Sequence, residues 1–150
     1  MREVFFLPYV DPHMEIGSTA ARVDAPLDEL AGSISECLRQ LAPQIVLTRG
    51  SNGEYGHPQR NFTHRATRLA LAGLHSAAEL WTWAAWYDNS ERERLLNRYD
   101  RADVVRDITP WLEAKLAAGL CHRTQHTMFL RNSGVADVPA MIGRVESFRR

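Results

Sequence analysis

Short apolar runs along the chain predict four β-strands. Residues 4–7 (VFFL) are continuously apolar, and residues 44–48 (QIVLT) have an apolar centre, which is typical of strands buried on both faces. Residues 80–87 alternate tryptophan with smaller side chains and predict a third strand. Residues 102–108 predict a short fourth strand.

Between these runs, apolar residues recur at the spacing of a helix. The first such series predicts a helix that Asp24 caps and Pro43 ends, and it consists of Leu27, Leu30, Ile34, Leu38 and Leu41. A second helix is predicted over residues 63–78. A third is expected to start at a Thr109 cap, with Pro110 in its first turn, and to continue through residues 111–130. Residues 89–101 are predicted to be a polar, partly helical connection, and residues 137–148 a short terminal helix.

This alternation of strands and helices predicts an α/β fold with a mainly parallel sheet flanked by helices. Ligands of such sheets bind beyond the carboxyl ends of the strands. The loop that carries His57 follows the strand predicted at residues 44–48. We therefore expect the functional site at that edge of the sheet.

Composition and charge exclude several classes of partner. The formal net charge is zero, so we expect no nucleic-acid partner. The longest apolar region, residues 69–87, contains His75 and Glu79, and its pattern does not suit a membrane span. Cys37 and Cys121 form no CxxC pair and are expected to be reduced and buried. With Glu3 so near the start, no signal peptide is expected, and the prediction is a cytoplasmic protein.

The segment "NGEYGHPQRNFTHRA", residues 52–66, holds two histidines seven positions apart, His57 and His64. Zinc is held by neutral imidazoles and carboxylates, and both rings could face one crevice if the helix starts near residue 61. The alternative is that both rings hydrogen-bond to nearby backbone. Gly53, Gly56 and Pro58 specify a tight, defined backbone, which argues against that alternative.

Several segments together resemble one known family. "QIVLTRGSNGEYGHPQ" followed by "HRA", and "DITPWLEAKLAAGLCHRTQ" downstream, carry the strongest matches. "FFLPYVD" near the start and "ESF" near the end match more briefly. Their order and spacing are similar to those of the PIG-L/LmbE-type deacetylases, and the resemblance runs along almost the whole chain.

The resemblance implies a Rossmann-like fold, with residues 1–150 forming the C-terminal part of a single deacetylase domain. It also implies a zinc-dependent amidase that removes acyl groups from a small-molecule amino-sugar conjugate such as an N-acetylglucosaminyl compound. In that family a metal-activated water attacks the amide carbonyl, with an Asp as general base. The residue that matches the oxyanion-stabilising imidazole is His57.

The chain departs from the family pattern at the early "HPDDE" motif, which it does not contain. Residues 9–23 imitate this motif with Asp11, His13 and Glu15, but they lie too close to the 44–48 strand to replace it. We expect instead that the first strands of the domain, with their acidic motif, are missing. Loss of these strands would expose a sheet edge and favour a homo-oligomer.

A second departure concerns the metal ligands. An ungapped alignment puts Arg60 where the family has a metal-binding histidine, and an arginine cannot ligate zinc because it stays protonated. A gapped alignment makes His64 the ligand instead. By resemblance, Glu54, Tyr55 and His122 are candidate contacts to the substrate. The alternative function is a catalytically inactive homologue without its metal, or a module that binds a sugar conjugate.

Overall fold

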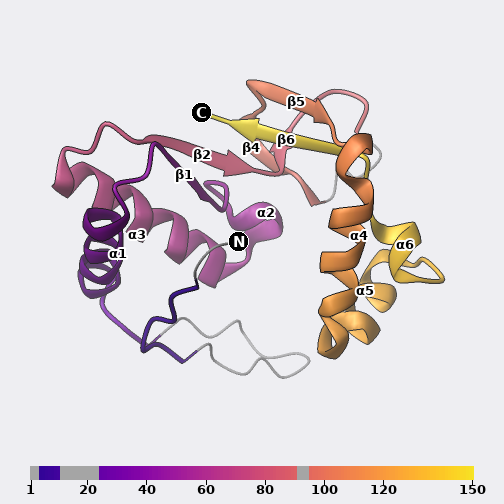
Figure 1. The fold of residues 1–150 in the computed structure, drawn as a ribbon, viewed down its shortest axis with the longest axis horizontal. Helices are drawn as coiled ribbons and strands as arrows, with labels where there is room; N and C mark the ends of the chain where they lie inside the picture. The colour runs from indigo at the N-terminus through magenta and orange to yellow at the C-terminus, as the bar shows by residue number, and fades with distance from the viewer. Residues whose placement is uncertain (1–3, 11–23, 91–94) are drawn as a thin grey trace. The chain divides into compact units, whose positions relative to one another are not determined.

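The structure, a computed structural model, describes residues 4–10, 24–90 and 95–150 (Figure 1). The chain divides into two compact units. The first contains residues up to Asp103 together with Phe148–Arg150, and the second is Val104–Ser147. Helices accompany a sheet, so the predicted α/β fold is confirmed.

The core of the first unit lies between two helices, α1 (Leu27–Leu41) and α3 (Pro58–Leu74). Leu30 and Ala31 from α1 are buried against Ala66 and Ala70 from α3. Small alanines on α3 let the two helix backbones approach closely. Around this core pack six partly buried side chains, those of Leu7, Tyr9, Leu27, Ile34, Leu38 and Phe62.

Both helices begin differently from the prediction. Pro26, not Asp24, stands at the N-cap of α1, and no side chain caps that end. The helix ends where predicted, because Ala42 adopts a left-handed conformation just before Pro43. Helix α3 begins five residues before the predicted 63, since Pro58 has the fixed φ that suits a first helical position.

A mixed sheet accompanies these helices. Strand β1 (Ile45–Thr48) runs parallel to β2 (Glu79–Trp83), as predicted, with Ile45 opposite Glu79. The end of strand β6 (Val145–Arg149) pairs antiparallel with β2 on its other side. Among the described residues β1 therefore forms one edge of the sheet. Ile45 and Leu47 are about half exposed there, so the prediction that both faces of this strand are buried is wrong.

A second, two-stranded sheet completes the first unit. Ala84 has a positive φ of 54° and interrupts the predicted third strand. Beyond it, β3 (Ala85–Trp86) pairs in parallel with β4 (Asn97–Arg101). Strand β4 lies in the segment predicted to be a polar connection, and this prediction is wrong over its second half. Residues 91–94 of that segment lie outside the described residues.

The second unit is mostly helical. Strand β5 (Val104–Asp107), predicted correctly, lies beside β6. The predicted long helix is divided into 3-10 turn η2 (Thr109–Trp111), α4 (Leu112–Cys121), 3-10 turn η3 (Arg123–Gln125) and α5 (His126–Ser133). The break falls at His122, whose ψ of 49° is not helical and whose N–H bonds to the carbonyl of Gly119. A four-residue helix, α6 (Val138–Met141), follows.

Within the described residues, one predicted strand is absent and one predicted helix is shorter than expected. Residues 4–7 form no strand, because Leu7 and Tyr9 pack on the helical core and the Tyr9 hydroxyl lies 2.9 Å from Ser33 Oγ. The terminal helix predicted over residues 137–148 ends at Met141, and its last residues join β6 instead. The neighbouring strands β2 and β5 decide the conformation of these last residues, which local propensity leaves ambiguous.

Cys37 and Cys121 are free cysteines, but the prediction that both are buried is wrong, because Cys37 is half-buried and Cys121 is exposed. Among the described helices, none combines the length and hydropathy that crossing a bilayer requires.

Candidate functional site

The candidate site is built on the loop and helix that follow β1, at the carboxyl end of that strand, where the sequence placed it. A single helical turn, α2 (Gly53–Gly56), connects the loop to α3. Gly53, Glu54 and Gly56 all have positive φ, between 60° and 88°. A Cβ on Gly53 would lie 3.0 Å from the backbone nitrogen of Asn61, so this turn needs glycine for space as well as for its backbone conformation.

Asn97 of β4 anchors the loop from below. Its side chain is fully buried, and its Oδ1 accepts the backbone N–H of Glu54 at 2.8 Å. Its Nδ2 donates to the carbonyls of Trp83 and Ala84, at 3.1 and 3.3 Å. Gly50 packs so closely that a Cβ there would lie 2.1 Å from Asn97 Cγ. A single buried amide thus joins the loop to the end of β2.

The Glu54 carboxylate is also buried, with a side-chain exposure of 4%. One oxygen accepts the Arg60 guanidinium at 2.6 Å, and the other accepts the indole N–H of Trp83 at 3.2 Å. Arg49 lies 3.9 Å from the same carboxylate and stacks its guanidinium 4.3 Å from the Trp83 ring centre. Glu54 therefore holds the loop together, and a ligand that used this carboxylate would have to displace Arg60.

His64 lies in the second turn of α3, not in its first, because the helix starts earlier than predicted. Its side chain is buried, and its Nδ1 lies 2.8 Å from the carbonyl of Arg49. A carbonyl only accepts, so Nδ1 carries the proton and Nε2 carries the lone pair when the ring is neutral. This is the tautomer of many metal-ligating histidines, and it is equally the backbone-bonded alternative.

His57 stands at the junction of α2 and α3, where it is the C-cap residue of α2 and the N-cap residue of α3. Its backbone N–H donates to Gly53, and its carbonyl accepts the N–H of Asn61. The side chain is half-buried. The tight turn around it thus fixes the backbone from which the imidazole projects.

The residues described do not by themselves make a zinc site. No group of three or more His, Cys, Asp or Glu side chains comes together within residues 4–10, 24–90 and 95–150. Nε2 of His64 could serve as one ligand, but Glu54 is engaged by Arg60, and Arg60 cannot ligate. The imitation motif with Asp11, His13 and Glu15 lies outside the described residues.

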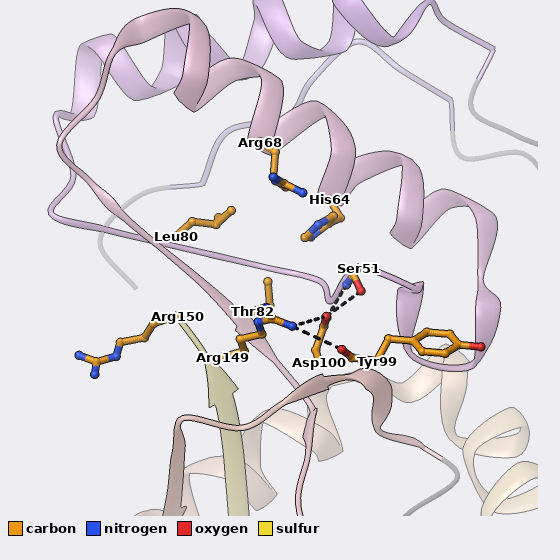
Figure 2. Close-up of a pocket in the computed structure, with 9 residues that line it drawn as sticks. All are labelled: Ser51, His64, Arg68, Leu80, Thr82, Tyr99, Asp100, Arg149 and Arg150. Atoms are coloured by element: carbon orange, nitrogen blue, oxygen red, sulfur yellow. Dashed lines mark hydrogen bonds and ion pairs between the residues drawn. The ribbon is translucent and has the colours of Figure 1, made fainter.

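A pocket of about 470 Å³ opens beside this loop (Figure 2). From α3, His64 and Arg68 point toward the side where β2 carries Leu80 and Thr82. Asp100 of β4 is buried, and it accepts the backbone N–H of Ser51 at 2.6 Å and the Ser51 hydroxyl at 2.7 Å. The pocket is completed by Tyr99, Arg149 and Arg150.

Glu54, His57 and His64 lie on α2, at the junction of α2 and α3, and on α3 of the first unit. His122 is exposed at the break after α4, in the second unit. The side chain of Tyr55 lies outside what the structure describes. Sequence reasoning missed Asn97 and Asp100, because these buried polar residues stand three apart on a strand whose faces alternate every two residues.

Comparison with known proteins supports a deacetylase family of the PIG-L/LmbE type. The chain is 30% identical over 131 residues to 1D-myo-inositol 2-acetamido-2-deoxy-alpha-D-glucopyranoside deacetylase of Mycolicibacterium smegmatis, covering 71% of this chain and 45% of the relative. Identity is 29% over 131 residues to the protein of that name from Thermomonospora curvata, covering 67% of this chain and 44% of the relative.

A shorter match has a higher identity. It is 44% identical over 61 residues to the Gordonia bronchialis protein of the same name, covering 37% of this chain and 22% of the relative. The chain thus spans less than half the length of these curated relatives. No family model matches it.

Proposed function

We propose that this chain forms part of an amide hydrolase that removes the acyl group from an N-acylated amino-sugar conjugate. The observation that carries the proposal is the similarity, over about two thirds of the chain, to proteins named as deacetylases of an acetamido-glucopyranoside of inositol. Further support comes from the loop after β1, which matches the family segment and lies at the carboxyl end of a parallel strand.

In this reaction water adds to the amide carbonyl and the C–N bond breaks. The acyl group leaves as a carboxylic acid and the sugar as an amine. His57 is proposed to donate a hydrogen bond to the oxyanion that forms on the carbonyl oxygen. Its position at a turn with three positive-φ residues supports this role, because a fixed backbone orients the donor before reaction.

Glu54 is proposed to orient the loop rather than to contact substrate. The ion pair with Arg60 and the bond from Trp83 occupy both of its carboxylate oxygens. Tyr55 and His122 stay proposed substrate contacts by resemblance. His64 is proposed as a single zinc ligand, so a zinc centre would need further ligands from outside the described residues.

The test of catalysis is release of acetate from the N-acetylglucosaminyl inositol compound named for the relatives. We expect His57→Ala to lower kcat by about 100-fold or more, as loss of an oxyanion donor does. His75→Ala, at an exposed helix end, is the matched control and should retain full activity. Equal activity of both variants and the unchanged protein would exclude the role of His57.

Zinc content is tested separately by elemental analysis of purified, folded protein. One zinc per chain that disappears in His64→Ala but persists in His75→Ala supports the ligand role of His64. A folded protein without zinc would contradict that role.

The Arg60–Glu54 ion pair favours a second candidate function, a homologue that binds an amino-sugar conjugate without hydrolysing it. In the ungapped alignment Arg60 matches the metal-binding histidine of the family, and here its guanidinium pairs with the Glu54 carboxylate at 2.6 Å. Saturable binding of the same compound, measured by calorimetry with no acetate released, would select this second function. Release of acetate would reject it, and absence of both binding and release would reject both functions.

A further inference from the structure

The pocket beside the candidate site has an excess of positive charge. Three of its lining residues are arginines, Arg68, Arg149 and Arg150, and one is an acid, Asp100. The guanidinium of Arg150 lies 5.7 Å from the ring centre of Trp81 and points away from the other lining side chains in Figure 2. Arg68 and Arg149 against Asp100 therefore leave an excess of one positive charge in the pocket. The whole chain has a formal net charge of zero, so this excess is a local feature. A concave site lined by one sign of charge attracts ligands of the opposite sign.

The single acid in the pocket is already engaged. Asp100 is 4% exposed, and both of its oxygens accept bonds from Ser51. Arg149 approaches the same carboxylate at 3.3 Å. Arg68, by contrast, forms no ion pair with any described residue, although Figure 2 shows it pointing from α3 into the same space as His64. Its charge is therefore available to a ligand.

A second, independent feature also points to a ligand. Thr82 of β2 lines the pocket and is 6% exposed, and its Oγ1 has no hydrogen-bond partner among the described residues. Buried hydroxyls are nearly always paired, since an unpaired one loses its bond to water on burial. A ligand or a water bound in the pocket would supply the missing partner.

We propose that this pocket binds a phosphate-type oxyanion carried by a small molecule. The guanidinium groups of Arg68 and Arg149 supply charged donors to the oxygens of a phosphate monoester, which arginine binds through several N–H groups at once. Arg68 on the helix and Arg149 on β6 stand on different elements, so donors approach from more than one direction, as a tetrahedral anion requires. The pocket volume of about 470 Å³ falls in the range of small-molecule sites, which leaves room for the group that carries the phosphate.

The proposal is independent of the deacetylase function, and its test does not use activity. Amide chemical shifts of the labelled protein are followed while inorganic phosphate is added at constant ionic strength. We expect saturable shifts at Ser51, Thr82 and Asp100. Absence of saturable shifts at these amides would overturn the proposal.

Arg68→Gln and Arg65→Gln make a matched pair of variants. Both arginines are exposed on α3, and both changes remove one charge, but Arg65 does not line the pocket. Arg68→Gln should weaken phosphate binding about tenfold, the worth of one charge-assisted hydrogen bond. Arg65→Gln should leave binding within about twofold. Equal weakening by both would show a general surface effect and overturn the site.

Thr82→Val tests the hydroxyl with almost no change in shape. We expect weaker phosphate binding in a protein whose spectrum is otherwise conserved, and unchanged binding would contradict a contact to Oγ1.

Four further ligands define the chemistry. Sulfate should compete with phosphate, and acetate should bind more weakly because it is planar and carries one charge. Glucose 6-phosphate should bind more tightly than inorganic phosphate, while glucose alone should not bind. Acetate binding as tight as phosphate would reassign the pocket to carboxylates and overturn the proposal. If glucose 6-phosphate bound no more tightly than inorganic phosphate, the claim that the pocket also holds the group that carries the phosphate would be wrong.

Discussion

Replacing Asn97 with alanine should destabilise the first unit more than any exposed substitution on the same strand. The side chain is fully buried and makes three hydrogen bonds, one from the Glu54 N–H and two to the carbonyls of Trp83 and Ala84. Truncation leaves the backbone N–H of Glu54 unpaired, and Glu54 is only 4% exposed. The Ala84 carbonyl keeps one partner, because it also accepts the backbone N–H of Asn97.

The magnitude follows from these losses. An unpaired buried donor costs about 1–3 kcal/mol, and each net hydrogen bond contributes about 1 kcal/mol. The truncation also leaves a cavity where the Asn97 side chain packs against Gly50. Together these losses should lower the free energy of unfolding of Asn97→Ala by about 3–4 kcal/mol. Domains of this size are stable by only about 5–15 kcal/mol, so the effect is easily measured.

The assay is urea-induced unfolding followed by tryptophan fluorescence and far-ultraviolet circular dichroism. Arg98→Ala, at the adjacent exposed position of β4, is the control and should change stability by less than about 0.5 kcal/mol. Asn97→Asp should be about as damaging as Asn97→Ala, because it turns a second acceptor toward two carbonyls. A loss below about 1 kcal/mol for Asn97→Ala would refute the reasoning that this amide anchors the loop.

Three more predictions use matched substitutions. Gly50→Ala should lower the free energy of unfolding by about 2 kcal/mol or more, since the new Cβ would lie 2.1 Å from Asn97 Cγ. Gly73→Ala, in a helix with open space around this position, should raise the free energy of unfolding by about 0.5–1 kcal/mol. Unfolding curves that show the same loss of stability for both variants would contradict the packing. Arg60→Met should cost about 1–3 kcal/mol by leaving buried Glu54 without its nearest cation, and exposed Arg65→Met almost nothing; equal curves would refute the buried ion pair. The Thr109 hydroxyl, and to a smaller extent the Thr109 backbone N–H, donates hydrogen bonds to Asp107. These bonds hold the pKa of the Asp107 carboxyl below its ordinary value. The ionised Asp107 carboxylate therefore stabilises the fold above the ordinary pKa, and this stabilisation is lost as pH falls through the lowered pKa. The unchanged protein should be more stable than Asp107→Asn at neutral pH, and this difference in stability should close below about pH 4. A difference that stays unchanged down to about pH 2 would contradict this bond.

Elements with a strong local pattern were predictable from the sequence. Helix α1 repeats leucine and isoleucine every three or four residues, and Pro43 stops it, so its end was placed correctly. β1 is a short apolar run, and β5 begins with two adjacent valines, which favour a strand. The position of the His57 loop also followed from the chain alone, because a loop after a parallel strand must emerge at the carboxyl edge of the sheet.

Other elements depended on partners far away in the chain. Residues 4–7 have the composition of a strand but pack on the helical core. Residues 145–149 could continue a helix, yet they form a strand that lies between β2 and β5, with Phe148 and Arg149 paired to β2. In both cases the long-range neighbour contributes more free energy than the local preference, which spans only about 1 kcal/mol.

The sequence by itself determined the helices and strands of strong period, the α/β class and the loop on which the candidate site is built. Tertiary structure alone decided which polar groups are buried together. Arg60 and Glu54 become an ion pair because α2 and α3 turn back on each other through positive-φ glycines. Asn97 and Asp100 hold the loop in place because their side chains on β4 accept the backbone N–H groups of Glu54 and Ser51. A buried polar group is stable only where all its partners converge, and such convergence is a property of the folded chain, not of any segment.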